Sequence, residues 1–233
     1  MLDILKDNWL LLLVGQYPNG AIGGLAATVG LALISLALAF PLGILLALGR
    51  ISTRKVFYLP ATAIVYIVRG LPLIMFIFWA YFFLPLVIGQ SVGGATTMVA
   101  ALVFYESAYL AEIIRSGIQA LPAGQLEAGR SLGLSYSQTM RKVILPQALY
   151  NTLPSMLSQF ISTVKETSLG FVISVHELTF AAAQVNNILL TKPFEVFALL
   201  ALTYFTLNLI LSGIIKLIES RIHTRRNPVL QVA

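Results

Sequence analysis

The sequence is short of charge and has no cysteine. Only 10% of its 233 residues are charged, while 58% are hydrophobic, and soluble domains carry roughly 25% charged residues. A chain this poor in charge cannot cover a water-facing surface, so we expect a lipid bilayer to be its solvent. The missing cysteines exclude a disulfide framework and a thiolate metal site. His176 and His223 are too far apart in sequence to form a metal cluster by themselves.

The sequence also argues against nucleic-acid binding and against ATP hydrolysis by this chain. The net charge of +6 does not indicate nucleic acid, because basic residues of membrane proteins gather at the cytoplasmic ends of their spans. The chain also has no glycine-rich phosphate loop ending in Gly-Lys-Ser or Gly-Lys-Thr, so we do not expect it to hydrolyse ATP. The N-terminus has no positive region and no small-residue cleavage site, which argues against a cleaved signal. Residues 3–14 are predicted as a short helix at the membrane interface.

Five stretches are long and apolar enough for a helix that crosses the bilayer, which needs about 20 residues. They are 21–48, one span within 57–88, 96–114, 143–164 and 194–218. We find no internal repeat and no low-complexity tract.

Two segments are irregular. In the second stretch, Pro72 disfavours helix at Leu71, so we expect residues 56–68 to lie along the cytoplasmic interface and residues 73–88 to cross. The segment 165–192 is apolar in its centre but broken by His176 and Glu177. It predicts a re-entrant or outward-facing helical element, which is tolerated only against protein or a water-filled cavity.

Basic residues predict the orientation of the chain. The turn at 49–56, the loop at 115–142 and the C-terminus together carry most of the Lys and Arg, while the opposite side keeps Lys6 and Lys192. By the positive-inside rule the first group is cytoplasmic. The N-terminus is therefore expected in the periplasm and the C-terminus in the cytoplasm, which five spans permit.

The loop at 119–142 has strong local signals. Residues 123–132 are good helix formers, and Gly133 is placed to end that helix in a left-handed conformation. Ser135 followed by Gln138 has the spacing of a capping box. The pattern predicts a short helix, a glycine turn and a second helix that leads into the fourth span.

In and just after this loop, Glu127-Ala128-Gly129, then Gly133, then Val143-x-Leu145-Pro146 resemble the EAA loop of ABC importer permeases. In that family the loop is the coupling helix that inserts into the nucleotide-binding subunit. Gly129 departs from the usual alanine, which weakens helix propensity by about 0.5–1 kcal/mol but keeps the position small. The resemblance implies that Glu127 is a polar anchor facing an ATPase; a solvated loop carboxylate is the alternative. The residues expected to couple to the ATPase are Gln125, Glu127, Ala128, Gly129, Gly133, Leu145 and Pro146.

Other segments resemble the polar amino acid permease subfamily, in the right order over about residues 20–220. The matching segments are Arg69-Gly70-Leu71-Pro72-Leu73, Glu106-Ser107-Ala108-Tyr109, Glu112 to Arg115 with Gly117, Gly124-Gln125, Pro146-Gln147-Ala148 and Lys165-Glu166-Thr167-Ser168-Leu169. This resemblance implies an all-α integral membrane protein of the type I importer permease fold with about five transmembrane helices. It divides the chain into a periplasmic or interfacial segment 1–19, a permease domain 20–220 and a cytoplasmic tail 221–233.

The resemblance also implies a function and an assembly. The chain would be the permease subunit of an ATP-driven importer in the bacterial inner membrane, working by alternating access. Its partners would be two ATP-binding cassette subunits, a second permease that is identical or a sister chain, a periplasmic amino-acid-binding protein and membrane lipid. ATP and Mg would be bound by the ATPase, and no cofactor by this chain. The rival class is an ion-coupled secondary amino acid transporter, which often has internal repeats.

Charged and hydroxyl side chains near the spans are candidates for the substrate pathway, each with a structural alternative. Arg69 is either a gate residue or a cytoplasmic anchor, and Glu106 either faces a cavity or makes a buried hydrogen bond to a neighbouring helix. Residues 165–168 either meet the substrate's charges or end a helix with an ion pair and a capping hydroxyl. The candidates are Arg69, Glu106, Lys165, Glu166, Thr167 and Ser168.

Two further interpretations concern substrate and pairing. Arg69 and Lys165 make glutamate or aspartate the first-choice substrate, with glutamine or a basic amino acid behind. Glu112 and Arg115 lie three residues apart on one helical face and are expected to pair with each other.

Overall fold

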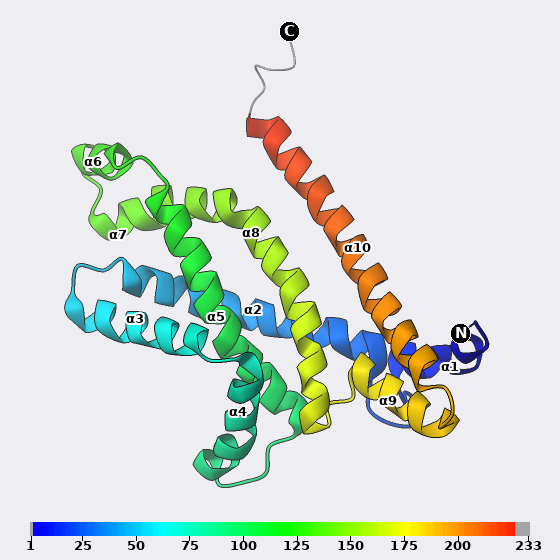
Figure 1. Cartoon of the computed structure of the whole chain (residues 1–233). Helices are drawn as coiled ribbons and strands as arrows, with labels where there is room; N and C mark the ends of the chain where they lie inside the picture. Colours follow the sequence, from blue (N-terminus) through cyan, green and yellow to red (C-terminus); the bar gives the residue numbers. More distant parts are fainter. Residues whose placement is uncertain (1, 227–233) are drawn as a thin grey trace. The chain divides into compact units, whose positions relative to one another are not determined.

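The computed structural model describes residues 2–226, with side chains as far as Arg221, and nearly all of these residues are helical (Figure 1). Among them only two isolated β-bridges occur, and no strand. The expected all-α class is therefore confirmed. The helices are α1 (Leu2–Val14), α2 (Gly24–Arg50), α3 (Lys55–Gly70), α4 (Leu73–Ile88), α5 (Gly94–Gln119), α6 (Gly124–Ser131), α7 (Tyr136–Thr139), α8 (Leu145–Glu166), α9 (Leu178–Leu189) and α10 (Pro193–Arg226).

Two short segments of other helical types complete the chain. A π-helical turn at Met140–Ile144 joins α7 to α8, and a 3₁₀ helix at Thr167–Ile173 follows α8. The predicted tail 221–233 begins inside α10, and residues 227–233 lie outside the described part of the chain.

The helices pack as two units, each built from separate stretches of sequence. Unit 1 contains Met1–Leu33, Ser91–Met98 and Phe160–Ala233, and unit 2 contains Ile34–Gln90 and Val99–Gln159. The long helices α2, α5 and α8 each contribute residues to both.

In the part of the chain that the structure describes, three helices are long and apolar enough to cross a membrane alone, namely α2, α5 and α10. The pair α3 and α4 forms a fourth candidate that is bent by 109°. The bend falls at Leu71, which is extended (φ −103°, ψ 141°) before Pro72, as the sequence predicts. The expected fourth span, α8, is 22 residues long but is too polar to count with the others. The total of five spans therefore stays a prediction.

Small residues bring the helices of unit 2 close together. A Cβ added to Gly43 of α2 would lie 2.8 Å from the Leu110 Cβ of α5, and one added to Gly117 of α5 would overlap Thr152 of α8. Close backbone approach at glycine is a common way for membrane helices to associate, because apolar burial gives little driving force in lipid. These contacts join α2, α5 and α8, and the α6–α7 segment connects α5 to α8.

Unit 1 has a hydrophobic core of its own. Ile4 and Leu12 on one face of α1 pack with Leu178 and Val185 of α9 and with Val196 at the start of α10. The helix predicted at residues 3–14 is thus observed as α1, and it packs against the connection between α8 and α10. Its place at the membrane interface stays a prediction.

Candidate functional site

The loop at 119–142 folds as the sequence predicts, with α6, a glycine turn and α7 in succession. Gly133 adopts φ +79°, a left-handed conformation that favours glycine. Its N–H donates to the Arg130 carbonyl at 2.9 Å, and the Leu134 N–H donates back to the Gly129 carbonyl at 3.0 Å. These bonds satisfy carbonyl groups that the end of α6 would otherwise leave free.

The predicted capping box at the start of α7 is also present. The Gln138 N–H donates to the Ser135 Oγ at 3.3 Å, and the Ser135 N–H donates to the Gln138 Oε1 at 2.8 Å. The two residues satisfy each other's backbone groups, so the second helix begins where its own sequence directs.

The surroundings of Gly129 explain why glycine replaces the usual alanine there. It is buried against Thr139, and an added Cβ would lie 2.5 Å from the Thr139 Cγ2 and 2.7 Å from its Oγ1. The Thr139 hydroxyl itself donates to the Ser135 carbonyl at 3.1 Å. In this chain threonine fills the space next to position 129, so α6 and α7 can approach closely only because position 129 has no side chain.

A pair of amide groups fastens α6 to α8. The Gln125 Nε2 donates to the Gln147 Oε1 at 3.0 Å, and the Gln147 Nε2 donates to the Gln125 Oε1, also at 3.0 Å. Gln147 donates further to the Val143 carbonyl at 2.8 Å. The loop is therefore fixed at both ends of α6, by Gln125 at its start and Gly129 near its end.

The outer face of this helix–turn–helix is exposed. Glu127, Ala128, Arg130 and Ser131 face solvent, and Leu132 at the tip is 81% exposed. An exposed apolar residue that follows an acidic and a basic residue on the same short helix can enter a groove on a partner. The structure thus gathers the predicted coupling residues on one element, with Leu145 and Pro146 at the start of α8. Their role in docking stays a prediction.

A network of four charged residues lies in unit 2. It is near the turn at 49–56 and the loop at 115–142, which are predicted to be cytoplasmic. Glu112 contacts Arg50 of α2, lies 2.5 Å from the Arg115 Nη2 and lies 3.7 Å from the Arg69 Nη1. The Arg69 guanidinium also covers the Tyr109 ring at 5.2 Å, and Arg50 covers the Tyr66 ring at 5.5 Å. The predicted Glu112–Arg115 pair is observed.

Arg50 and Arg69 extend the predicted pair into a network across three helices. The sequence analysis missed Arg50 as a partner, because it is 62 positions away from Glu112. Arg69 is tied to α5, which fits the anchor interpretation; a gating role stays a prediction.

Glu106 makes a buried hydrogen bond to a neighbouring helix, which was one of its two interpretations. It is fully buried on α5, and the Gln159 Nε2 of α8 donates to its Oε2 at 2.9 Å. A buried carboxylate on an apolar helix is costly unless it has such partners. The bond joins two helices of unit 2, and a place on the substrate pathway stays a prediction for Glu106.

The other pathway candidates, residues 165–168, lie in unit 1. The Thr167 hydroxyl donates to the Val164 carbonyl at 2.8 Å, and the Ser168 hydroxyl donates to the Lys165 carbonyl at 2.7 Å. Both hydroxyls bond to carbonyl groups at the end of α8. One of the two interpretations expected a hydroxyl to cap the next helix instead, and these bonds do not do so. Among the described side chains, Lys165 and Glu166 form no ion pair.

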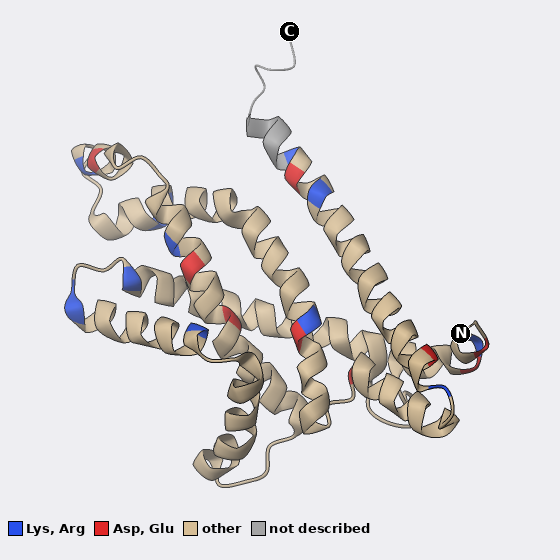
Figure 2. Cartoon of the chain, in the orientation of Figure 1, with Lys and Arg blue, Asp and Glu red and all other residues tan. Residues whose placement is uncertain are grey.

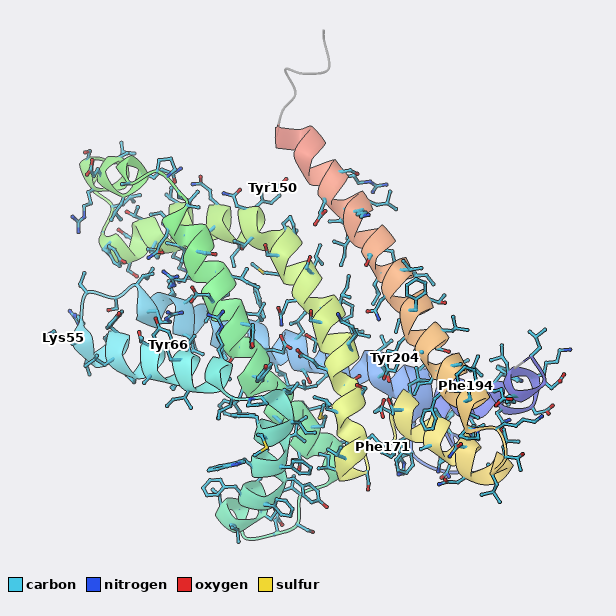
Figure 3. The ribbon with its side chains drawn as sticks, in the orientation of Figure 1. Lys55, Tyr66, Tyr150, Phe171, Phe194 and Tyr204 are labelled. Carbon is cyan, nitrogen blue, oxygen red and sulfur yellow. The ribbon has the colours of Figure 1, made fainter. Side chains whose placement is uncertain are left out.

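Glu177 is the residue that caps the next helix. It is fully buried, and its carboxylate accepts from the Thr179 N–H at 2.8 Å, the Phe180 N–H at 3.0 Å and the Tyr204 hydroxyl at 3.0 Å. Tyr204 lies on α10 (Figure 3). Burial raises the pKa of Glu177, while the two N–H groups oppose the rise by stabilising the ionised form.

The sequence analysis treated Glu177 only as a break in an apolar segment. The signal that could have found its role is an acidic residue directly before a helix-forming run. His176 beside it is exposed and stacks on Phe180 with ring centroids 4.4 Å apart.

Charge is unevenly distributed in unit 2. Figure 2 shows Lys and Arg at the α2–α3 turn and around α6 and α7, whereas α4 carries none. The described residues contain no group of His, Cys, Asp and Glu that could hold a metal ion.

Comparison with known proteins gives the chain a family. Residues 39–224 match the family described as binding-protein-dependent transport system inner membrane component. The chain is 39% identical over 200 residues to the probable glutamine ABC transporter permease protein GlnP of Bacillus subtilis (strain 168), covering 85% of this chain and 91% of that protein. It is 37% identical over 220 residues to the probable glutamine ABC transporter permease protein GlnM of the same organism, covering 94% and 97%.

A solved structure agrees with these relatives. A crystal structure of an amino acid ABC transporter with histidines matches with a TM-score of 0.81 at 33% identity, covering 94% of this chain and 97% of the other.

Proposed function

The chain belongs to the family of binding-protein-dependent transport system inner membrane components and is an amino-acid ABC transporter permease, and we propose that it imports a polar amino acid by alternating access. It is a transport subunit and not an enzyme; the ATPase activity of such transporters lies in separate subunits. The observation that supports the proposal is the exposed α6–Gly133–α7 element, whose residues resemble the family's coupling loop.

The proposed cycle uses that element to transmit motion. Closure of two ATP-binding cassette subunits moves α6, and the spans then open the pathway toward a periplasmic amino-acid-binding protein. After hydrolysis the pathway opens to the cytoplasm. Nucleotide can drive this change only if it binds the two states with different free energies. A second permease, identical or a sister chain, completes the assembly, with the N-terminus of this chain in the periplasm and the C-terminus in the cytoplasm.

The proposed substrate is glutamate or aspartate, with glutamine next. The acidic choice rests on Lys165, which is exposed and has no acidic partner among the described side chains, and less on Arg69, whose charge is shared with Glu112. Glutamine is supported by the names of the two Bacillus relatives. A carboxyl and a carboxamide group of the same length differ mainly in charge, so the binding protein can set the choice between them.

Two variants of the loop test the coupling assignment. Glu127→Lys reverses the exposed charge on α6, and Gly133→Pro forbids the positive φ of the turn. We expect ATP-driven uptake to fall at least about tenfold in each, equivalent to about 1.4 kcal/mol of docking free energy, while insertion and assembly with the second permease persist. Asp7→Lys, an equal reversal at an exposed position of α1, is the control. Unchanged uptake and unchanged ATPase recruitment in both loop variants would show the assignment to be wrong.

The substrate is tested on the purified complex with its binding protein. ATPase activity is measured with each polar amino acid in turn. Stimulation by glutamate or aspartate is the expected result, and a response to arginine or lysine alone would contradict it. Uptake driven by an ion gradient, without ATP and without the ATPase partner, would instead favour the secondary-transporter alternative.

A further inference from the structure

Two adjoining cavities form one groove in unit 2, beside the α6–α7 element. Their volumes are about 710 Å³ and about 660 Å³, and both are lined by Ile51, Ser52, Tyr136 and Met140. The α2–α3 turn forms one wall, and residues of α6, α7 and the start of α8 form the other. We call this the turn groove.

The charge of the turn groove is strongly positive. Its lining contains four arginines and a single carboxylate, Glu127. Arg54 and Arg141 are exposed, as is Lys55 at the same turn (Figure 3). Among the described side chains, no ion pair involves Arg54, Arg141 or Arg130.

The fourth arginine, Arg50, increases this imbalance. Its side chain is only 8% exposed, and among the described side chains its sole acidic partner is Glu112, which Arg69 and Arg115 share. Three guanidinium groups therefore face one carboxylate directly behind the wall of the groove. The Arg50 Nε is buried without a hydrogen-bond partner. An anion at the groove would offset a charge that the chain's own carboxylates leave uncompensated.

The remaining lining is amphipathic. Ser52, Tyr58 and Tyr136 offer hydroxyl groups, and Phe57, Leu126 and Leu145 offer apolar surface. Arginine and hydroxyl donors suit phosphate oxygens, and adjacent apolar side chains suit an acyl chain. Basic pockets between membrane helices at the cytoplasmic leaflet are typical places for anionic lipid headgroups.

We propose that the turn groove binds the phosphate of an anionic phospholipid from the cytoplasmic leaflet. The proposal rests on the proposed orientation, which puts this end of unit 2 in the cytoplasm. The bound lipid contacts the α2–α3 turn and the α6–α7 element together. It therefore stabilises the position of the α6–α7 element relative to the membrane-spanning helices of unit 2. Anionic lipid thus favours the coupling of ATP hydrolysis to transport.

The test uses the whole transporter complex in nanodiscs of phosphatidylcholine with or without phosphatidylglycerol. Lipid retained after delipidation is counted by native mass spectrometry. We expect retention of phosphatidylglycerol over phosphatidylcholine, and a fall of about 25-fold in its affinity in the double variant Arg54→Gln/Arg141→Gln, roughly fivefold for each arginine. Arg221→Gln, an exposed arginine of α10 outside the groove, should retain lipid as the unmodified complex does.

Three outcomes would overturn the proposal. They are equal retention of phosphatidylcholine, unchanged retention in the double variant, and displacement of the lipid by millimolar glycerol phosphate, which would assign the groove to a soluble phosphate. Amino acid uptake is measured in vesicles of the same two compositions. Uptake without selective lipid retention contradicts only the lipid site, whereas selective retention without ATP-driven uptake contradicts only the proposed function.

Discussion

The α6–α7 loop and the connection between α8 and α10 both join long helices, yet they are stabilised in different ways. In the loop, the hydrogen bonds that set its shape join residues at most 22 positions apart, from Gln125 to Gln147. In the connection, the Leu178 N–H donates to the Thr28 hydroxyl, 150 positions away, and the Gly24 N–H donates to the His176 carbonyl. A segment shaped by its own neighbours can be predicted from sequence, and one shaped by distant partners cannot.

The largest expected effect comes from a variant that disrupts the connection between α8 and α10. Glu177→Ala removes the helix cap and leaves the Tyr204 hydroxyl and two N–H groups without their buried acceptor. We expect a loss of about 3 kcal/mol in the free energy of unfolding, measured by denaturation in detergent. Tyr204→Phe should cost less, about 1 kcal/mol, because the two N–H bonds to the Glu177 carboxylate remain.

Asp7→Ala, which removes an exposed carboxylate of the same unit, is the control and should change little. If Glu177→Ala were no less stable than Asp7→Ala, the distant contacts would not be what holds this connection.

A smaller effect is expected inside the loop. Gly129→Ala places a Cβ against Thr139 and forces α6 away from α7, at a cost of about 1–3 kcal/mol. The matched control is Gly124→Ala in the same helix, where a Cβ meets open space and, at the first helical residue, gains less than the ~1 kcal/mol of an interior Gly→Ala change. Binding of the ATPase subunit should therefore weaken in the first variant and not in the second.

A double variant sharpens this result. Thr139→Ala removes the atoms that the new Cβ meets, so Gly129→Ala/Thr139→Ala should recover most of the lost binding. Residues in direct contact give such non-additive effects. Strictly additive losses would mean that the two positions do not constrain each other.

The smallest effect concerns the cap of α7. Ser135→Ala removes the acceptor of the Gln138 N–H and should cost about 1 kcal/mol. Because the cap is local, hydrogen exchange should rise at residues 135–139 and stay unchanged in α9. Ser137→Ala, an exposed neighbour, provides the comparison. Faster exchange in both segments would show that the loop and the connection are not independent.

The parts of the structure that the sequence predicted are those with local signals. The break at Leu71 and Pro72, the left-handed Gly133 and the capping box at Ser135 all depend on residues within one or two turns. Hydrophobic runs located the apolar spans, because length and composition are enough for that purpose.

Most of the parts that were missed depend on a residue of another helix. Arg50 joins the Glu112 network from another helix, and the reason for glycine at position 129 is Thr139, on the helix that follows. The direction of the Thr167 hydroxyl bond could not be predicted, because a threonine at a helix boundary can serve either side. The polar residues that keep α8 from being a clear span include Gln159, which contacts Glu106.

The reciprocal amide pair of Gln125 and Gln147 has a consequence for how the transporter responds to its surroundings. Neither amide carries a formal charge or titrates, so ionic strength and cytoplasmic pH should leave this fastening of α6 to α8 almost unchanged. Salt can act on α6 and α7, the proposed docking element, only through exposed charges such as Glu127 and Arg130. A permease fastened in this way would keep the shape of its docking element through osmotic stress, and only the strength of ATPase attachment would vary.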